Sequence, residues 1–574
     1  MASIPLLLLV AIGAHSSGAT QKKGQSRSTP NAEMAKAVAA EKAGDFKSAM
    51  DHYRKAAESD PKNVTAHKHY VNMAKYLLVD QKMKEWDGAH PELSSSDESV
   101  LSRADEERAA HEIQVRREVN SSLFDQYQQW SKKYPNNAIF LWALAKTKEE
   151  SDPRAAEQYY LKAIEIDPKF ADAYTFLSLL QDALGDQTSY RETLRKAVAA
   201  FPNDPDFLFY YCSAMEDVDR EEFKRLSMEI VEKYPESQRA PQALYWLANS
   251  APTPEEEVRL LELLRKKFPP AKYQWSSNGM NMLFDIYNQI DRSKALALAE
   301  DMVKEDPKPQ LGPDTWMRRA KYARAMVQTE KLLDDGKPKS ALETINTIVA
   351  PRNVNGQCLE LLRARAVDAT GDTGKAYSDL LKNYSMTPTD NVERTLNEYG
   401  EKLGKDHSDV ESDIWSLLRA TAGPATPFSL FNYVTRKSSS LSEFRGQVVL
   451  LNFWYPRCGP CRGEFRYIKA VLEKYKSQGF QIIAVNVYPQ QDEEVLPLLK
   501  GFGLDFIPLK GSYKWAQDVY KIQGEPTNFL IGGDGLIYFG PLGSIHNAET
   551  QRTLELQVEA LLQHTRTTSV PLTQ

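Results

Sequence analysis

A periodicity of about 34 residues is the feature that most constrains how this chain of 574 residues can fold. Five prolines, each closing a helical stretch, follow one another at intervals of 33 or 34 residues: Pro135, Pro168, Pro202, Pro235 and Pro269. A repeat of this length is typical of proteins in which each unit is a pair of helices. Because one pair cannot bury its apolar stripe alone, successive pairs must stack. The sequence therefore predicts an all-α repeat array over residues 31–415.

Small and aromatic residues recur at fixed offsets within the period. The first unit carries them at Gly44, Ala49, Tyr53, Ala56 and Pro61. Alanine lets paired helices approach, glycine ends the first helix, the aromatic ring fills the gap and proline stops the second helix. This pattern resembles the tetratricopeptide (TPR) family, which implies an α-solenoid whose concave face binds a peptide or protein. The alternative is that the array only spaces or supports the C-terminal domain.

The repeat pattern weakens in two places. Between Pro61 and Pro135 the stretch Glu92 to Glu112 is rich in Ser, Glu and Arg, which predicts an inserted loop or an exposed helix, and the match weakens again beyond Pro269. Two isolated cysteines, Cys212 and Cys358, lie inside the array. Such cysteines are most often small buried hydrophobes, and the alternatives are regulatory thiols or a bridge between the two.

The N-terminal residues have the shape of a secretory signal peptide. An apolar run extends from Ile4 to Ala14, and Ser17-Gly18-Ala19 supplies small residues at a cleavage site, although no Lys or Arg precedes the run. The run is well short of the roughly 20 residues that span a bilayer. We expect a signal peptide over 1–19, a flexible lead-in over 20–30, and export to the periplasm or cell envelope or by secretion. The alternative is an uncleaved N-terminal anchor.

Composition argues against one class of partner. Lys and Arg number 72 against 78 Asp and Glu, so the net charge is −6 and no clustered positive field is indicated. A nucleic-acid partner is therefore not expected.

The helical pattern ends in a stretch rich in proline and glycine. Gly423, Pro424 and Pro427 fall close together, which predicts a linker over 416–427. Beyond it the pattern becomes strand-like, so we expect an α/β domain over 428–565 and a tail over 566–574.

A strand, a Cys-x-x-Cys motif and a helix follow one another in this second domain. The apolar run Val448–Trp454 predicts a buried parallel strand, and the apolar spacing from Gly463 to Tyr475 predicts a helix. Between them lies Cys458-Gly459-Pro460-Cys461, a pattern typical of a redox dithiol that forms a Cys458–Cys461 disulfide. The alternatives are a fixed disulfide or half a zinc site. Zinc prefers four ligands and no second pair is near, so neither a metal nor a cofactor is expected.

The placement of the two cysteines indicates their roles. Cys458 precedes the first helical turn, where free N–H groups and the helix dipole favour the thiolate that attacks a disulfide. The adjacent Arg457 adds positive charge. Cys461, one turn further, is positioned to resolve the mixed disulfide.

The domain resembles the thioredoxin fold, and within it the exported TlpA-like thiol–disulfide oxidoreductases of the redoxin/AhpC-TSA-type superfamily. Besides the dithiol, four segments carry the resemblance: Pro427–Leu430, Leu441–Gly446, Asn452–Trp454 and Glu525–Ile531. The expected fold is thus a TPR solenoid followed by an α/β thioredoxin fold.

The resemblance also implies roles for single residues. Pro526 is expected to be cis and to face the dithiol, with the Glu525 backbone pairing to the client and with Trp454 and Arg457 in the substrate surface. Asn452 stands where cytosolic thioredoxins keep a buried acid. Glu464 is therefore the expected proton acceptor for Cys461, the alternative being a solvated helix carboxylate.

Two residues depart from the family pattern. Arg457 replaces the usual aromatic residue before the first cysteine, and Arg466 replaces a helix proline. Both changes alter the surface and the charge beside the dithiol.

These features together predict a thiol–disulfide oxidoreductase that acts on protein disulfides outside the cytoplasm. It would need protein clients and an external electron donor or acceptor, with the TPR array docking a partner. One alternative is a thiol peroxidase, but the Pro-x-x-x-Thr/Ser-x-x-Cys pattern is missing, since Leu451 and Tyr455 occupy the Pro and Thr/Ser positions relative to Cys458. The other is a TPR scaffold with an incidental redox fold.

Overall fold

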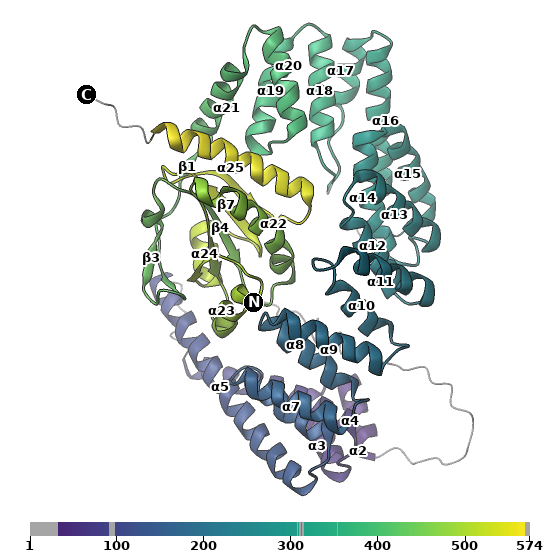
Figure 1. Ribbon diagram of the computed structural model, residues 1–574, viewed down its shortest axis with the longest axis vertical. Coiled ribbons are helices and arrows are strands. Elements are labelled where there is room, and N and C mark those ends of the chain that lie inside the picture. The colour runs from purple at the N-terminus through teal and green to yellow at the C-terminus, as the bar shows by residue number, and fades with distance from the viewer. Residues whose placement is uncertain are drawn as a thin grey trace. The chain divides into compact units, whose positions relative to one another are not determined.

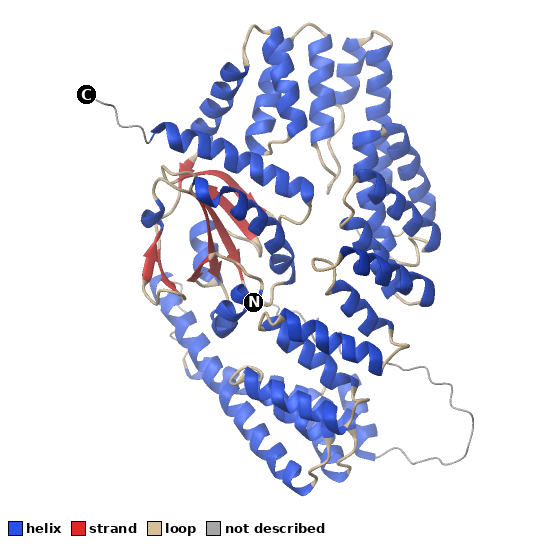
Figure 2. Ribbon diagram, in the orientation of Figure 1, coloured by secondary structure: helices blue, strands red, loops and turns tan. Residues whose placement is uncertain are grey.

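The computed structural model describes residues 32–90, 98–306, 308, 312, 315–352 and 354–568 (Figures 1 and 2). The expected signal peptide (1–19) and lead-in (20–30) lie outside the described residues. The chain divides into two compact units, one ending at Glu85 and one beginning at Trp86, so the boundary falls inside helix α4. Among the described residues, no helix combines the length and the apolar character that crossing a membrane requires.

Helices occupy the described chain up to Thr421, and from α5 onward each helix packs against the next one along the chain (Figure 2). Their bounds are α2 (Ala32–Lys42), α3 (Phe46–Ser59), α4 (Val64–Ala89), α5 (Glu98–Lys133), α6 (Ala138–Lys148), α7 (Pro153–Ile166), α8 (Ala171–Ala183), α9 (Gln187–Ala200), α10 (Pro205–Ser213), α11 (Arg220–Lys233), α12 (Arg239–Asn249), α13 (Pro254–Lys267), α14 (Gln274–Ile290), α15 (Arg292–Glu305), α16 (Thr315–Asp334), α17 (Pro338–Asn346), α18 (Gln357–Ala369), α19 (Thr373–Met386), α20 (Asp390–Lys402) and α21 (His407–Thr421).

The repeat positions serve the packing that their spacing predicts. In α7 the residues Ala156, Tyr160 and Ala163 are all fully buried, so the small side chains allow close approach and the ring fills the space between them. The Tyr160 hydroxyl donates to Glu149 Oε1 at the end of α6, 2.6 Å away, which ties the two helices of the unit together. Gly185 ends α8 with φ +71°, a conformation that favours glycine. The TPR prediction is confirmed.

The structure also shows what forms where the repeat pattern weakens and where the two isolated cysteines lie. Helix α5 begins at Glu98, so the segment predicted as an inserted loop or an exposed helix is largely helical. Cys212 and Cys358 are free and buried, as predicted, and burial raises the pKa of their thiols to about 12 and about 11.

The predicted linker over 416–427 needs a correction. Helix α21 continues to Thr421, and Gly423–Pro424 forms strand β1, with Gly423 paired antiparallel to Ile537. The outer edge of the strand that contains Ile537 offers unpaired backbone groups, and Gly423 and Pro424 pair with some of them. The connection is thus part of the sheet.

The second domain is one eight-stranded sheet with helices on both faces, in the strand order β1-β8-β7-β4-β5-β6-β2-β3 (Figure 1). The remaining strands are β2 (Ser429–Asn432), β3 (Ser438–Ser440), β4 (Val448–Trp454), β5 (Phe480–Asn486), β6 (Ile507–Lys510), β7 (Thr527–Ile531) and β8 (Leu536–Leu542). The helices are α22 (Gly459–Tyr475), α23 (Asp492–Gly501), α24 (Tyr513–Tyr520) and α25 (Ala548–Thr568), with short 3-10 turns η2 (Leu441–Phe444), η3 (Lys476–Gln478) and η4 (Pro489–Gln491).

Strand β4 is central and buried along its whole length, as its apolar run, interrupted by Asn452, predicts. It pairs parallel with β5 and antiparallel with β7. Alternate side chains enter two cores, Val448 and Leu450 on the side of α22 and α25, and Val449 and Leu451 on the side of α24. This arrangement holds the C-terminal end of β4, where the dithiol follows.

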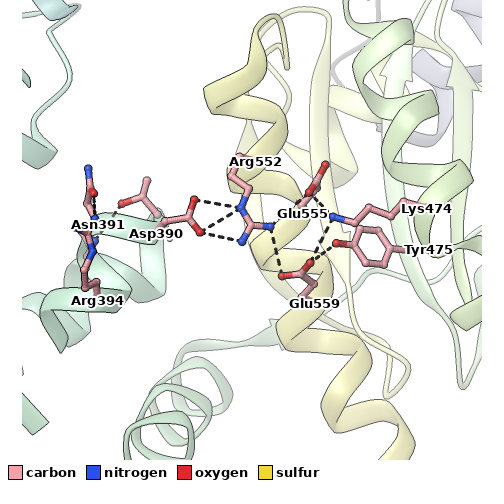
Figure 3. A network of polar contacts seen from close by, with 10 residues as sticks. Asp390, Asn391, Arg394, Lys474, Tyr475, Arg552, Glu555 and Glu559 are labelled. Atoms are coloured by element: carbon pink, nitrogen blue, oxygen red, sulfur yellow. Dashed lines mark hydrogen bonds and ion pairs between the residues drawn. The ribbon is translucent and has the colours of Figure 1, made fainter. Parts of the chain in front are cut away.

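The solenoid contacts the sheet domain through ion pairs on α25. Arg552 bonds Asp390 of α20 at 2.8 Å and also faces Glu559 at 3.6 Å (Figure 3). Lys474 of α22 bonds Glu555 of α25 at 2.6 Å. Figure 3 shows this chain of alternating charges running from α20 through α25 to α22, the helix that carries the dithiol.

Candidate active site

The dithiol lies where β4 ends and α22 begins. Cys458 is the N-cap residue of α22, and its Sγ accepts a hydrogen bond from the Cys461 backbone N at 3.1 Å. The two cysteines form a disulfide with a Cα–Cα distance of 5.3 Å. In the reduced protein the same N–H and the helix dipole would stabilise a thiolate at Cys458.

Glu464 lies one helical turn beyond Cys461, on the same face of α22, and is fully buried. Its Oε1 accepts from Asn452 Nδ2 at 2.7 Å, and its Oε2 accepts from the Ile545 backbone N at 3.1 Å. Burial raises the pKa of Glu464 to about 7, against the opposing effect of these hydrogen bonds. The alternative of a solvated helix carboxylate is therefore wrong.

Two hydrogen-bond partners of Glu464, namely Asn528 and Ile545, were missed from the sequence. Asn528 Nδ2 contacts Glu464 Oε2 at 3.3 Å and Asn452 Nδ2 contacts Asn528 Oδ1 at 2.8 Å, while Ile545 acts through its backbone. Asn452 and Asn528 are directly paired in the register of β4 and β7. The signal that could have pointed to Asn528 is a lone amide directly before the apolar run of a buried strand.

The Glu525–Pro526 peptide bond is cis, as the resemblance implies. Thr527 pairs with Phe453 in the antiparallel register of β7 and β4. Pro526 and Glu525 consequently precede β7 at the end of the sheet where β4 ends and the dithiol follows.

Trp454 cannot fill the substrate-contacting role expected for it. Its side chain is fully buried and packs edge-on against Phe465 of α22, with ring centroids 5.3 Å apart. As the last residue of a strand covered on both faces, it belongs to the core rather than to the client surface.

Arg457 is exposed but its charge is already compensated. Its guanidinium Nε lies 3.0 and 3.1 Å from the two carboxylate oxygens of Glu494 on α23. The Arg457 backbone N also donates to Gln491 Oε1 at 2.9 Å. The expectation that Arg457 supplies a free positive charge beside Cys458 is therefore corrected, because Glu494 offsets it.

Two arginines of α22 connect the dithiol helix to the solenoid. Arg462 bonds Asp182 near the end of α8, and Arg466 bonds Asp217 after α10 at 2.6 Å. Beside these pairs, Gly185 and Gly501 meet backbone to backbone, so that a Cβ on either would collide with the other chain segment. Arg466, noted in the sequence only as a replacement for proline, is thus a solenoid contact.

Comparisons with known proteins agree with both halves of this architecture. The redoxin family model matches residues 421–532, and the tetratricopeptide repeat model matches residues 34–63 and 148–170.

Relatives named for thiol–disulfide chemistry align with the sheet domain. The chain is 33% identical over 115 residues to the thiol-disulfide oxidoreductase ResA of Bacillus subtilis (strain 168), covering 20% of this chain and 64% of that protein. Over 133 residues it is 30% identical to ResA of Bacillus thuringiensis subsp. konkukian (strain 97-27), covering 23% of this chain and 74% of that protein. The chain thus spans slightly less than two thirds of the B. subtilis relative.

A solved structure is also similar to part of this chain. It is a thiol:disulfide interchange protein of the thioredoxin family from Chlorobium tepidum TLS, 24% identical, with a TM-score of 0.22 and coverage of 25% of this chain and 97% of that one. On the identity and coverage of the B. thuringiensis relative, the chain belongs to the ResA family of thiol-disulfide oxidoreductases, with a redoxin domain that follows tetratricopeptide repeats.

Proposed function

We propose that this protein exchanges disulfides with protein clients outside the cytoplasm, using Cys458 and Cys461 as its dithiol. One observation carries the proposal. Cys458 caps the N-terminus of α22 and is bonded to Cys461, while a buried carboxylate, Glu464, lies one turn further along the same helix. A nucleophile, a resolving thiol and a proton acceptor therefore line one helix face in the order that exchange requires.

The first step in the reducing direction is attack by the Cys458 thiolate on a client disulfide. A bond forms between Cys458 Sγ and one client sulfur, and the other client sulfur leaves as a thiolate that takes a proton from solvent. Cys458 is the attacking sulfur because it alone stands at the helix N-terminus, where the developing negative charge is stabilised.

The second step releases the client. Glu464 takes the proton of the Cys461 thiol, and the resulting thiolate attacks Cys458 Sγ, expelling the second client sulfur and re-forming the Cys458–Cys461 disulfide. A carboxyl group with a pKa of about 7 is suited to this transfer at neutral pH. The client gains two electrons, which an external dithiol donor must return to the protein. The same steps in reverse oxidise a client.

The proposal assigns a task to each part of the chain. Residues 1–19 direct export, the solenoid over 31–415 docks a protein partner, and residues 428–565 carry out exchange. The matches to tetratricopeptide repeats support the docking role, because stacked helix pairs present an extended concave surface.

Trapping of the mixed disulfide tests the proposal. Cys461→Ser in the full-length protein should accumulate a client linked to Cys458, because the resolving thiol is gone. Cys458→Ser should abolish turnover of a model disulfide, while Cys212→Ser, a change at a buried free cysteine, should leave turnover unchanged. Full turnover by Cys458→Ser would refute the assignment.

A further inference from the structure

A carboxylate without a counter-ion lies next to the cis proline, at the end of the sheet where the dithiol follows β4. Glu525 immediately precedes the cis Pro526 and is half-buried. Its Oε1 is buried and has no hydrogen-bond partner, and across the described ranges no lysine, arginine or histidine pairs with it. Burial raises the pKa of Glu525, with only its own backbone N–H opposing the shift. The group is therefore partly desolvated and uncompensated.

The charge of this carboxylate acts on two tyrosines, Tyr455 and Tyr488. The negative charge of Glu525 adds to burial in raising the pKa of both Tyr455 and Tyr488, so both hydroxyls lie within its electrostatic reach. The Tyr455 and Tyr488 rings are 4.4 Å apart between centroids, and Tyr488 stands 6.3 Å from Tyr513. Tyr455 also accepts, through its backbone O, a hydrogen bond of 3.0 Å from the Cys458 backbone N. The charge of Glu525 therefore reaches the loop that leads into the dithiol.

The one arginine of that loop does not neutralise Glu525. Arg457 forms an ion pair with Glu494 of α23, which offsets its charge. Arg462, which follows Cys461 in α22, is engaged by Asp182. Neither arginine is therefore available to Glu525 within the described residues.

We propose that Glu525, together with the rings of Tyr455 and Tyr488, binds a lysine or arginine side chain of the client next to the cysteine that exchanges. This inference rests on the proposed function and names its substrate class: disulfides flanked by a basic residue. A carboxylate attracts the cation by charge, and the faces of tyrosine rings attract it through their quadrupoles. Partial desolvation strengthens both interactions relative to a fully hydrated surface.

Competing peptides test the inference with the full-length protein. Two synthetic peptides with an internal disulfide differ only in the residue after one cysteine, which is lysine in one and glutamine in the other. We expect the wild type to reduce the lysine peptide with a kcat/KM roughly tenfold higher, the factor typical of one charge-assisted contact. Glu525→Gln should remove that preference. Glu493→Gln, at an exposed carboxylate of α23, should keep it.

A charge reversal provides the second variant. Glu525→Lys should prefer a third peptide that carries glutamate in place of the lysine, which a purely structural role for Glu525 would not produce. Equal kcat/KM for the lysine and glutamine peptides in the wild type, or an unchanged preference in Glu525→Gln, would overturn the inference while leaving the proposed function intact. If the wild type reduces none of the peptides, the proposed function fails and this inference fails with it.

Discussion

The carboxylate of Glu464 lies against the side-chain amide of Asn452, with 2.7 Å between Oε1 and Nδ2. Both groups are fully buried, one on α22 and the other on the central strand β4. An amide can donate to a carboxyl group in either protonation state, whereas a buried acid beside Glu464 would repel its charge. Asn452 therefore fixes the position of Glu464 and leaves Glu464 as the titrating group of the pair.

Glu464→Gln should slow resolution of the mixed disulfide more than its formation. The amide cannot accept the Cys461 proton, whereas attack by Cys458 does not depend on that transfer. General-base assistance typically contributes about 100-fold or more, so the resolving step should fall by roughly that factor. Stopped-flow measurement of the two phases checks this, and an unchanged pH profile of both phases would remove Glu464 from the mechanism.

The pH dependence of stability should also follow Glu464. Its pKa in the folded protein is about 7, above the ordinary 4.5, so the fold favours the protonated form. The stabilisation it gives is complete below pH 4.5 and is lost as the pH rises through 7, with a total near 3 kcal/mol, or about 1.4 kcal/mol per pH unit. Glu464→Gln should flatten this part of the curve in urea unfolding between pH 5 and 8. An equally steep curve in the variant would place the proton uptake elsewhere.

Glu494 should control how reactive Cys458 is. Glu494→Gln frees the positive charge of Arg457, which then favours the neighbouring thiolate. We expect the reduced variant to be alkylated by iodoacetamide at pH 7 several-fold faster than the wild type, since one nearby charge shifts ionisation by up to about one pH unit. Glu493→Gln, the exposed neighbour on the same helix, is the matched control. Equal rates in all three proteins would show that Arg457 does not reach the thiolate.

The features that the sequence predicts correctly here are those set by residues close together in the chain. The solenoid follows from alanine, tyrosine and glycine at fixed spacing, because each residue serves the contact of adjacent helices. The Cys458–Cys461 site follows from a strand, a three-residue spacing and a helix. The pairing of Arg457 with Glu494 joins residues far apart in the chain, and no periodicity records it.

Two further expectations failed because contacts between distant parts of the chain decided the outcome. Gly423 and Pro424 have the composition of a linker, but the edge of β8 gives them strand partners. Trp454 closes an apolar run whose members look alike in the sequence, and only the packing of α22 shows that its ring points into the core.

The buried Arg319 of α16 should lower the free energy of unfolding. Its side chain is fully buried, and none of its three guanidinium nitrogens has a hydrogen-bond partner among the described residues. The rings of Trp316 and Phe284 lie 5.0 and 5.6 Å from its Cζ, and the charge of Asp285 acts on it without a hydrogen bond, so its charge is compensated only in part. Arg319→Met keeps the apolar stem and removes the desolvated charge, so it should stabilise the protein by about 1–3 kcal/mol. Arg318→Met, an exposed neighbour, should change the Tm little, and a lower Tm in Arg319→Met would mean that the charge is satisfied.

Gly501→Ala should loosen the contact between the solenoid and the dithiol helix. The added Cβ would collide with the backbone of Gly185, and Gly185 at φ +71° has little freedom to move away. The turn after α8 would have to withdraw from α23, and the neighbouring Arg462–Asp182 ion pair would be stretched or broken. We expect faster hydrogen exchange in residues 181–187 and 497–502, with the centre of the sheet unaffected. Gly463→Ala is the control, because its Cβ meets open space on α22 and alanine favours a helix by about 1 kcal/mol. Unchanged exchange in Gly501→Ala would show that the two backbones do not touch in solution.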